Sequence, residues 1–449
     1  MSQPSEVASG ASGLTAGGND DARSGSCPQD CQGHCDPRSR SPPAPLTAGG
    51  SSGDGRDTRH ELSVGAEADD AEVGKDGPGP DAEILAEQYG VSVEVMYEYM
   101  QAEERLGVLA NTARKLAGDR LAGSWLEWNP GPHLVVSLTD GPALPEVEGV
   151  LDAARESVEV RYGAKASLAT LRAGAAVVYE KLAPAAGLRV STYVLESGGQ
   201  VVVTVEGVGT GDASAADIAA FTDSVSRVGV PVTVKTTGGS AQYENRGGRF
   251  LTQCTSAFVV WNEYYRGYLT AGHCGSTQDY KWWSDGSWRP TTYVRELWDY
   301  LRDVQLHRHV PGQQLFEPLF HASVADARHQ DGVYSYGEGS NICKWGSRSN
   351  VTLCTKVTAI DFRPASCGPY NGPCADVFVI VNLSDVAISC RGDSGGPWFH
   401  NNLAAGIHSG AANYYSDDQA CISGTNRYAY FTPISNALGP LGVALLTSP

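Results

Sequence analysis

The sequence lacks the features that indicate a membrane span or a nucleic-acid interface, and it also lacks a recognisable signal peptide. It has no run of about 18 apolar residues, the length that a membrane-spanning helix needs, and no stripe of Lys and Arg of the kind that contacts a phosphate backbone. Its first 30 residues hold no apolar segment behind a basic start, so no signal peptide is expected there. We therefore expect neither a membrane nor a nucleic-acid partner.

Residues 1–80 contain few aromatic and β-branched side chains and many Gly, Ser, Asp, Ala and Pro residues. Such a segment buries too little apolar surface to offset its chain entropy, so we predict a disordered, acidic, low-complexity region. Within it lie Cys27, Cys31, His34 and Cys35, which are residue types that bind metals. Their spacing matches no established zinc or iron–sulfur pattern, so we assign no metal.

The rest of the chain divides where its charge changes. The formal net charge is −18 at pH 7. Residues 237–449 contain 15 Lys and Arg and 17 Asp and Glu, which leaves 18 and 34 in residues 1–236. The acidic first half and the nearly neutral second half are therefore predicted to be separate domains, in a chain long enough for two or three.

Residues 81–236 carry the pattern of an α+β domain. Apolar residues at helical spacing alternate with short valine-rich runs, and Ser214 is placed to cap the last helix. The predicted helices cover 84–121 (with a break near Gly90), 167–182 and 214–228; the predicted strands cover 124–128, 133–138, 190–195, 201–205 and 230–236. A Gly-rich, polar junction over residues 237–248 follows, and its exposed backbone is where we expect a maturation cut.

Residues 249–449 show almost no helix pattern. Short strands alternate with turns, and many short strands over about 200 residues indicate an all-β sandwich or a pair of barrels. The predicted strands cover 257–262, 267–270, 303–307, 353–358, 377–381, 398–399, 404–408 and 429–434.

A serine stands between small residues in the stretch from Cys390 to Trp398, which reads Cys-Arg-Gly-Asp-Ser-Gly-Gly-Pro-Trp. A serine hydroxyl becomes a good nucleophile only when a base removes its proton and N–H groups hold the oxyanion that forms. The glycines around Ser394 allow a tight turn and a close approach of substrate. A second stretch, which reads Thr-Ala-Gly-His-Cys, supplies His273 as a base.

Together these two motifs resemble those of the chymotrypsin-like (trypsin-fold) serine proteases. The cysteine spacing and the long leader are similar to the secreted bacterial branch, the streptogrisin and alpha-lytic-like enzymes. The resemblance covers roughly residues 100–445 and is strongest from Cys254 to Ile434. It implies that residues 249–449 form two six-stranded antiparallel barrels with the active site in the cleft between them.

The first half also takes part in this resemblance. The stretch from Leu121 to Trp125, the valine-rich strand after it and the sequence Thr139-Asp140-Gly141 resemble the pro-region of the bacterial proteases. The resemblance implies that residues 81–236 are a pro-domain, which assists folding, inhibits the enzyme and is later cut away. The alternative is an unrelated α+β domain that stays attached.

The resemblance implies a serine endopeptidase that works through an acyl-enzyme, without a cofactor. Ser394 is the expected nucleophile and His273 the expected general base, and a buried carboxylate should hold the imidazole in one tautomer. Two acids lie at a suitable distance in the sequence, Asp299 and Asp303. Asp303 is preferred because it heads the alternating run Val304-Gln305-Leu306.

The groups around the nucleophile follow from the same resemblance. The oxyanion hole is expected from the backbone N–H groups of Gly392 and Ser394. Asp393 needs a cation, and no Ile-Val-Gly-Gly start follows the junction, so the cut N-terminus that animal relatives use is not expected. Lys344, directly after Cys343, is the candidate instead.

The substrate pocket is expected to be apolar at its base. The family pattern places Ile388 at the base with Ser389 beside it, Ser409 and Gly410 on the far wall, and Ala429 at the back. No acid stands at the base, so we expect an apolar P1 residue rather than Lys or Arg. Arg391 at the entrance and His408 before Ser409 keep glutamate open as an alternative.

Eleven cysteines are present, and the eight after residue 237 are compatible with four disulfides, although sequence alone does not fix their pairing. The family pattern implies the pairs Cys254–Cys274, Cys343–Cys354 and Cys390–Cys421, which leaves Cys367 with Cys374. Disulfides need an oxidising compartment, so we expect a secreted monomer that acts on protein or peptide substrates. Free thiols would instead indicate an intracellular enzyme with a permanently attached acidic domain.

Two further features stay open at this level. An aromatic group follows His273 in the sequence and is either a polymer-binding surface or loop packing: Tyr280, Trp282, Trp283, Trp288 and Tyr293. A catalytically inactive relative that acts as a binding protein is the rival function, although such relatives usually lose a catalytic residue and all three candidates stand here.

Overall fold

In the computed structural model of the chain, the described residues are 78–129, 131–154, 156–207, 213–236, 241–243, 251–252, 254–281, 287–310, 316–323, 326–365, 367, 374–375, 377–382, 389–412 and 428–447. Residues from Glu72 onward form one compact unit. The disorder predicted for residues 1–80 falls almost entirely outside the described residues, as does the cysteine cluster at Cys27.

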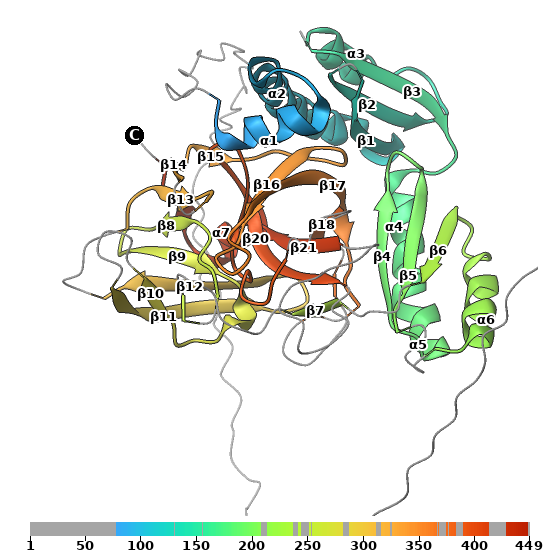
Figure 1. Ribbon diagram of the computed structural model, residues 1–449. Helices are drawn as coiled ribbons and strands as arrows, with labels where there is room; N and C mark the ends of the chain where they lie inside the picture. The colour runs from blue at the N-terminus through green and yellow to red at the C-terminus, as the bar shows by residue number, and fades with distance from the viewer. Residues whose placement is uncertain are drawn as a thin grey trace, which may run out of the picture. The chain divides into compact units, whose positions relative to one another are not determined.

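After α1 (Pro80–Tyr89), the first half repeats one order of elements, helix–strand–strand–helix–strand (Figure 1). The first copy consists of α2 (Val93–Ala117), β1 (Leu121–Trp128), β2 (Pro132–Thr139), α3 (Pro145–Asp152) and β3 (Val158–Ala164). The second consists of α4 (Leu168–Val177), which a π turn and α5 (Ala183–Ala186) extend, then β4 (Val190–Leu195), β5 (Gln200–Val205), α6 (Ala215–Val225) and β6 (Val232–Thr236). In each copy the first two strands are antiparallel and the third joins the second in parallel. Each copy thus forms a three-stranded sheet.

Local sequence signals set the helix boundaries in this half. Gly90 ends α1 with φ 66°, a left-handed conformation that glycine adopts without strain. Ser92 then caps α2 by accepting a hydrogen bond from the N–H of Val95. Ser214 forms a capping box with Asp217 at the start of α6. The predicted helices over 84–121 and 214–228 are therefore present, with the predicted break and cap.

Two elements of the first half were not predicted, α3 and β3. All strand residues of β3 are at least partly exposed, so its side chains show no clean alternation of apolar and polar. α3 has only eight residues and two buried ones, Val147 and Leu151.

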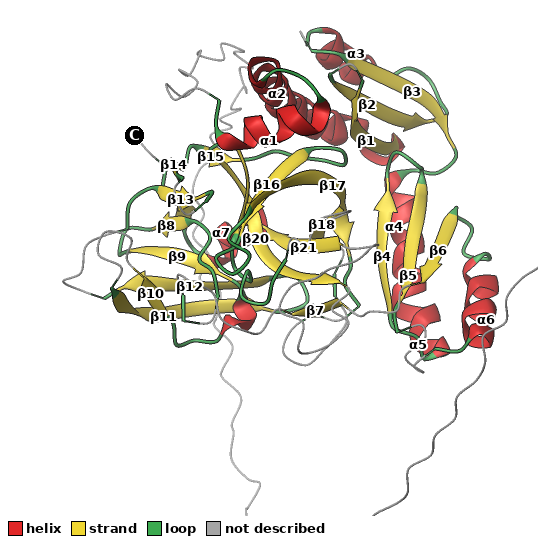
Figure 2. Ribbon diagram, viewed as in Figure 1, coloured by secondary structure: helices red, strands yellow, loops and turns green. Residues whose placement is uncertain are grey.

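The second half consists almost entirely of strands, as Figure 2 shows. A six-stranded sheet has the order β10-β11-β12-β9-β8-β22. Its strands are β8 (Val259–Trp261), β9 (Arg266–Thr270), β10 (Asp279–Lys281), β11 (Trp288–Trp298), β12 (Asp303–His309) and β22 (Ala444–Leu445). Among the described residues this sheet is an open path, so the first predicted barrel stays a prediction.

The second sheet closes on itself. Its order is β15-β20-β19-β16-β17-β18-β21, and β21 also pairs with β20, so six of these strands form a hydrogen-bonded ring. The strands are β15 (Gly332–Val333), β16 (Asn341–Trp345), β17 (Thr352–Phe362), β18 (Phe378–Asn382), β19 (Pro397–His400), β20 (Leu403–Ala412) and β21 (Tyr428–Pro433). β15 and β7 (Ala241–Tyr243) attach to β20 outside this six-stranded ring, so the whole sheet has eight strands. A small pair, β13 (Leu319–His321) and β14 (Ala327–His329), lies outside both sheets.

Several elements of the second half were not predicted: β10, β11, β13, β14, β15, β16, β22 and α7. β11 was not predicted because none of its residues is fully buried, which removes the apolar alternation of a half-buried strand. The helix α7 (Ile434–Leu441) begins where the last strand was predicted to end. It buries Ile434, Ala437 and Leu441 in the same apolar cluster as β8 and β12.

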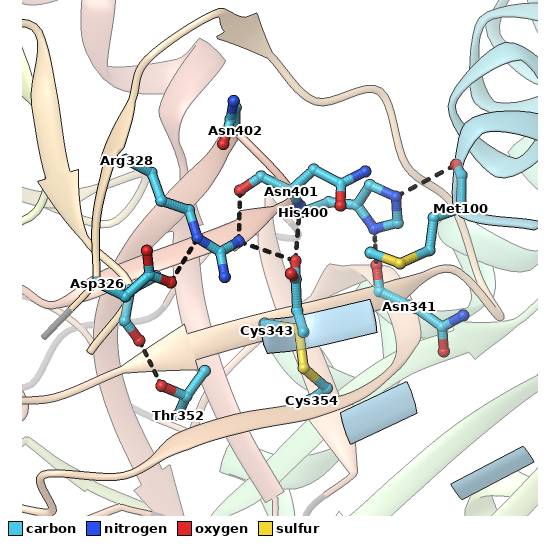
Figure 3. A network of polar contacts seen from close by, with 12 residues as sticks. Met100, Asp326, Arg328, Asn341, Cys343, Thr352, Cys354, His400, Asn401 and Asn402 are labelled. Atoms are coloured by element: carbon cyan, nitrogen blue, oxygen red, sulfur yellow. Dashed lines mark hydrogen bonds and ion pairs between the residues drawn. A yellow bond between two sulfur atoms is a disulfide. The ribbon is translucent and has the colours of Figure 1, made fainter. Parts of the chain in front are cut away.

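Buried polar contacts join α1 and α2 to the second sheet. Asp81 is fully buried and accepts from the Arg328 guanidinium at 3.0 Å and from the N–H of Asn401 at 3.0 Å. Figure 3 shows the Arg328 side chain between Asp326 and Asn401, and the His400 ring between Asn341 and Met100. The first half therefore contacts the second through paired buried charges. Removal of one partner would leave the other charge buried and would destabilise the protein.

Three of the implied disulfides are present: Cys254–Cys274, Cys343–Cys354 and Cys367–Cys374. Cys390 is also disulfide-bonded. Cys421 lies outside the described residues, so the pair Cys390–Cys421 stays a prediction.

Candidate active site

Ser394 lies in a tight turn directly before β19. The N–H of Asp393 donates to the carbonyl of Cys390 at 2.9 Å and closes the turn. Gly395 has φ 80°, and a Cβ at that position would lie 2.1 Å from Thr270 Oγ1, so only glycine fits there. The glycine after the serine is thus required by the close approach of β9 to the turn.

His273, Asp303 and Ser394 come from three separate parts of the chain and lie in one hydrogen-bonded row. His273 sits in the short turn after β9, and Asp303 opens β12. His273 Nδ1 lies 2.8 Å from Asp303 Oδ2, and His273 Nε2 lies 2.8 Å from Ser394 Oγ. The other oxygen of Asp303 accepts the backbone N–H of His273 at 3.0 Å.

This row has the geometry of a nucleophile, a base and a group that orients the base. The carboxylate of Asp303 accepts at Nδ1, so the neutral imidazole of His273 carries its proton there and presents Nε2 as the acceptor for the Ser394 hydroxyl. All three side chains are buried, which strengthens their electrostatic interactions relative to water. The arrangement can remove a proton from Ser394 and return it to a leaving group.

Next to Ser394, the backbone offers a hydrogen-bond donor. Gly392 has φ 102°, a conformation open to glycine. Its carbonyl accepts from Thr255 Oγ1 at 2.8 Å, while its N–H donates to no group among the described residues. That N–H is therefore available to a developing oxyanion.

Asp393 pairs with the predicted cation. Lys344 Nζ lies 3.0 Å from Asp393 Oδ2, and the exposed fractions of the two side chains are 1% and 0%. The other carboxylate oxygen accepts the N–H groups of Arg348 at 3.1 Å and Ser349 at 2.8 Å. A Cβ on Gly346 would lie 2.2 Å from the Asp393 carboxyl carbon, so glycine is needed for this approach. The prediction that Lys344 meets Asp393 is confirmed.

Two buried threonines support the row and were not predicted. Thr432 Oγ1 in β21 accepts the N–H of Asp303 at 3.1 Å and lies 3.1 Å from Ser409 Oγ. Thr255 donates its own N–H to the Ser394 carbonyl at 2.8 Å. No sequence signal marks these residues, because Thr432 lies in a strand, where threonine is common, Thr255 lies in a loop, and the partners of both are distant in sequence.

The predicted pocket residues that the structure describes lie together. Ser389, Ser409 and Ala429 are fully buried, and Ser389 Oγ lies 2.7 Å from His408 Nε2. Gly410 follows on the same strand, β20. Ile388, predicted at the pocket base, lies outside the described residues. Arg391 is half-buried.

The other candidates from the sequence have ordinary structural roles. Asp299 accepts the N–H of Leu301 at 2.8 Å and pairs with Arg302 at 3.0 Å, away from the His273–Asp303 contact. Tyr280 packs against Tyr268 and Phe316.

The predicted aromatic group is only partly described, and its two alternatives stay open. Trp288 and Tyr293 are 48% and 38% exposed, while Trp282 and Trp283 lie outside the described residues. Within the described ranges, no group of three His, Cys, Asp or Glu side chains is arranged to hold a metal ion. No helix there is long and apolar enough to cross a membrane.

The sequence is similar to a family model and to curated relatives. A family model described as Trypsin matches residues 233–438. Among curated relatives, Serine protease 1 of Streptomyces fradiae is 30% identical over 238 residues, which cover 51% of this chain and 60% of that protein. Glutamyl endopeptidase 2 of Streptomyces griseus is 31% identical over 212 residues, which cover 46% of this chain and 98% of that protein. The chain thus spans less than two thirds of the first relative and nearly all of the second.

Solved structures give matches of the same kind. A glutamic acid specific serine protease, described as using a novel histidine triad in substrate binding, is 25% identical, with a TM-score of 0.36 and coverage of 44% of this chain and 99% of that one. The Cellulomonas bogoriensis chymotrypsin is 22% identical, with a TM-score of 0.34 and coverage of 45% of this chain and 98% of that one.

Proposed function

The chain belongs to the trypsin family and is a serine protease, and from this premise we propose that it is a secreted endopeptidase, made as a proenzyme, that cleaves after glutamate. The observation that carries the catalytic part of the proposal is the row Asp303–His273–Ser394, with 2.8 Å at each side-chain contact.

In the proposed mechanism His273 takes the proton of Ser394 as the Oγ attacks the substrate carbonyl carbon. The N–H groups of Gly392 and Ser394 receive the oxyanion, a contribution of about 10²–10³ in rate for one donor. His273 then gives its proton to the leaving amine, which leaves an acyl-enzyme on Ser394. Water repeats these steps to release the acid and restore the serine. Asp303 keeps the proton of the neutral imidazole on Nδ1 throughout.

The glutamate preference is supported by the polar pair Ser389 and His408. Buried polar side chains are usually placed to hydrogen-bond a partner, and an imidazole and a hydroxyl both donate to a carboxylate. The relative of which the chain covers 98% is a glutamyl endopeptidase. The expectation of an apolar P1 residue rested on Ile388, which lies outside the described residues. We therefore favour glutamate over the apolar alternative.

The proenzyme part is supported by the strand that precedes the protease half. β7, which lies in the junction, pairs in antiparallel register with Gly410–Ala412 on β20. β20 is the strand next to the nucleophile, because the N–H of Gly395 donates to the carbonyl of His408 at 2.8 Å. An extended segment added to a strand edge is a common way to bind a peptide. The junction would thus occupy the place of a substrate until it is cut.

The proposal of an extracellular location rests on the disulfides. Three are formed among the described residues, and such bonds persist in oxidising compartments. The proposed partners are protein or peptide substrates and the chain's own residues 81–236, which would act as the pro-domain.

The test is expression of the full chain in an oxidising, secreting host, followed by treatment with a fluorophosphonate and intact-mass measurement. The expected result is a shortened species that begins near the junction and carries one adduct, which Ser394→Ala removes. Peptides with Glu, Leu, Phe or Lys at P1 then give the preference. A full-length species without an adduct would contradict the proposal and favour an inactive binding protein.

A further inference from the structure

The two ring nitrogens of His408 meet different partners. His408 lies on β20 directly before Ser409 and is 1% exposed. The indole N–H of Trp398 donates to His408 Nδ1 at 3.2 Å. On the other side of the ring, His408 Nε2 lies 2.7 Å from Ser389 Oγ.

These partners determine where the proton of the imidazole sits. An indole nitrogen is only a donor, so the nitrogen that it faces must be unprotonated. A neutral imidazole carries one proton, which then resides on Nε2 and is donated to Ser389 Oγ. In an imidazolium, Nδ1–H would face the indole N–H of Trp398, two donors without an acceptor in a buried site.

Trp398 is itself held rigidly. It is fully buried in β19, two residues after Gly396, and pairs with Gly406 across the sheet. Its ring stacks on Phe431, with centroids 5.2 Å apart and an interplanar angle of 22°. Ser394 and Trp398 thus lie on one continuous segment of the chain, so the residue that contacts His408 is covalently close to the nucleophile.

The side chains that hydrogen-bond the two nitrogens of the His408 ring, and the one opposite it in the ladder, are all neutral. β19 contributes Trp398, β21 contributes Phe431 as the partner of His408 in the ladder, and the segment before Ser394 contributes Ser389. None of these three side chains is charged at neutral pH. The tautomer is therefore set by hydrogen-bond geometry at these contacts.

We propose that Trp398 is a positioning residue that holds His408 in the neutral Nε2–H tautomer, so that the pocket receives the P1 side-chain oxygen with neutral donors. This inference rests on the proposed glutamate preference and refines its substrate class. Neutral donors hydrogen-bond to a carboxylate oxygen and to an amide oxygen alike, so glutamine should also be cleaved. The ratio of the two rates should not change as histidine side chains titrate.

The test compares the active enzyme with Trp398→Phe, which keeps the aromatic ring on Phe431 and deletes only the donor. The quantity measured is kcat/KM from pH 6 to 9 for peptides with Glu, Gln or Leu at P1, corrected by titration of Ser394 with a fluorophosphonate. In the unsubstituted enzyme we expect the Glu/Gln ratio to stay constant within about twofold, because the imidazole stays neutral. In Trp398→Phe we expect the ratio to rise about tenfold as the pH falls from 8 to 6, since Nδ1 is then able to accept a proton.

Phe431→Leu serves as the matched control, because it loosens the same packing without touching the hydrogen bond. It should keep the constant ratio. The Leu peptide should respond to pH in the same way in all three proteins, as it reports the catalytic histidine alone. A ratio that rises in acid in the unsubstituted enzyme, or stays constant in Trp398→Phe, would overturn the proposal.

A direct measurement covers the case in which Trp398→Phe does not fold. ¹⁵N NMR of the histidine-labelled Ser394→Ala full chain, with His408→Gln used for assignment, should show a pyridine-like Nδ1 and a pyrrole-like Nε2 from pH 6 to 9. Titration of His408 in that range would refute the inference. Cleavage that is no faster after Glu or Gln than after Leu would instead contradict the proposed glutamate preference, while the NMR result would still decide the tautomer.

Discussion

Lys344 Nζ lies 3.0 Å from Asp393 Oδ2, and neither side chain is exposed by more than 1%. This buried ion pair fixes the residue directly before the nucleophile. The two further N–H groups on the other oxygen of Asp393 hold the carboxylate in one orientation. The oxyanion turn is thus shaped by a lysine that belongs to β16 rather than by a chain terminus.

Replacement of Lys344 by Ala should destabilise the protein strongly. It leaves the Asp393 carboxylate buried without its cation, which typically costs about 3–5 kcal/mol. Urea unfolding gives the free energy, and fluorophosphonate titration gives the fraction of competent sites. Lys115→Ala, which removes an exposed lysine of α2, should change the stability by less than about 0.5 kcal/mol. Unchanged folding and activity in Lys344→Ala would contradict a role for this pair.

The choice between Asp303 and Asp299 is testable with two equivalent substitutions. Asp303→Asn should lower kcat by about 10⁴, as the same change does in the well-studied member of this family, because the amide no longer favours the correct tautomer of His273. Asp299→Asn should leave kcat almost unchanged, since Asp299 serves only its own loop. A comparable loss in both variants would argue against the assignment.

The maturation cut is expected after Glu244. The register places Tyr243 opposite Gly410, and a glutamate follows Tyr243 in the sequence. Glu244 itself lies outside the described residues, so this prediction rests on the register and the sequence. Glu244→Ala should abolish the cut at that bond, whereas Arg246→Ala should not. N-terminal sequencing of the secreted product checks both. An unchanged N-terminus at Asn245 in Glu244→Ala would refute the prediction.

Stability should fall as the pH rises from 5 to 8, because of Glu338. Burial raises the pKa of its carboxyl group to about 7, with hydrogen bonds from Ser197 and the N–H of Glu196 acting in the opposite direction. A pKa that is higher in the folded state means that the folded protein binds the extra proton. The contribution of Glu338 to the free energy of unfolding is therefore complete below about pH 4.5. It is lost as the pH rises through 7, which lowers the free energy of unfolding by up to about 3 kcal/mol.

Glu338→Gln should flatten that dependence, because the amide has no proton to lose. Urea unfolding at a series of pH values measures the slope. Glu317→Gln, at an exposed position, is the control and should keep the slope of the parent protein. Asp361, whose pKa burial raises to about 6, contributes in the same direction in both proteins. An equal slope in Glu338→Gln and the parent would exclude Glu338 as the cause.

Much of the fold could be predicted where the signal is local. The break at Gly90 and the cap at Ser214 are set by residues next to them, so both appear where the sequence placed them. β11 and β3 escaped prediction because their side chains are mostly half-exposed, and β15 has only two residues. Such strands exist because neighbouring strands supply their hydrogen bonds, which no local pattern records.

The site divides in the same way. The motifs around His273 and Ser394 are contiguous, and the position of Asp303 at the head of an alternating run is visible in the sequence. Thr432 is marked by no pattern, and the motif that ends at Trp398 does not show its role, because the importance of both residues arises from contacts with Asp303 and His408. Only the hydrogen bond from β12 to β21 across the two sheets and the pairing of β19 with β20 bring these groups together.

The sequence by itself therefore determined the family motifs, the division into an acidic and a neutral half, and the types of residue that carry the chemistry. The tertiary structure decided which acid meets His273, showed that Lys344 meets Asp393, and placed Trp398 and Ser389 at the two nitrogens of His408. The physical reason is that hydrogen bonds and ion pairs act over about 3 Å, while the residues that form them here are separated by up to 129 positions in the chain.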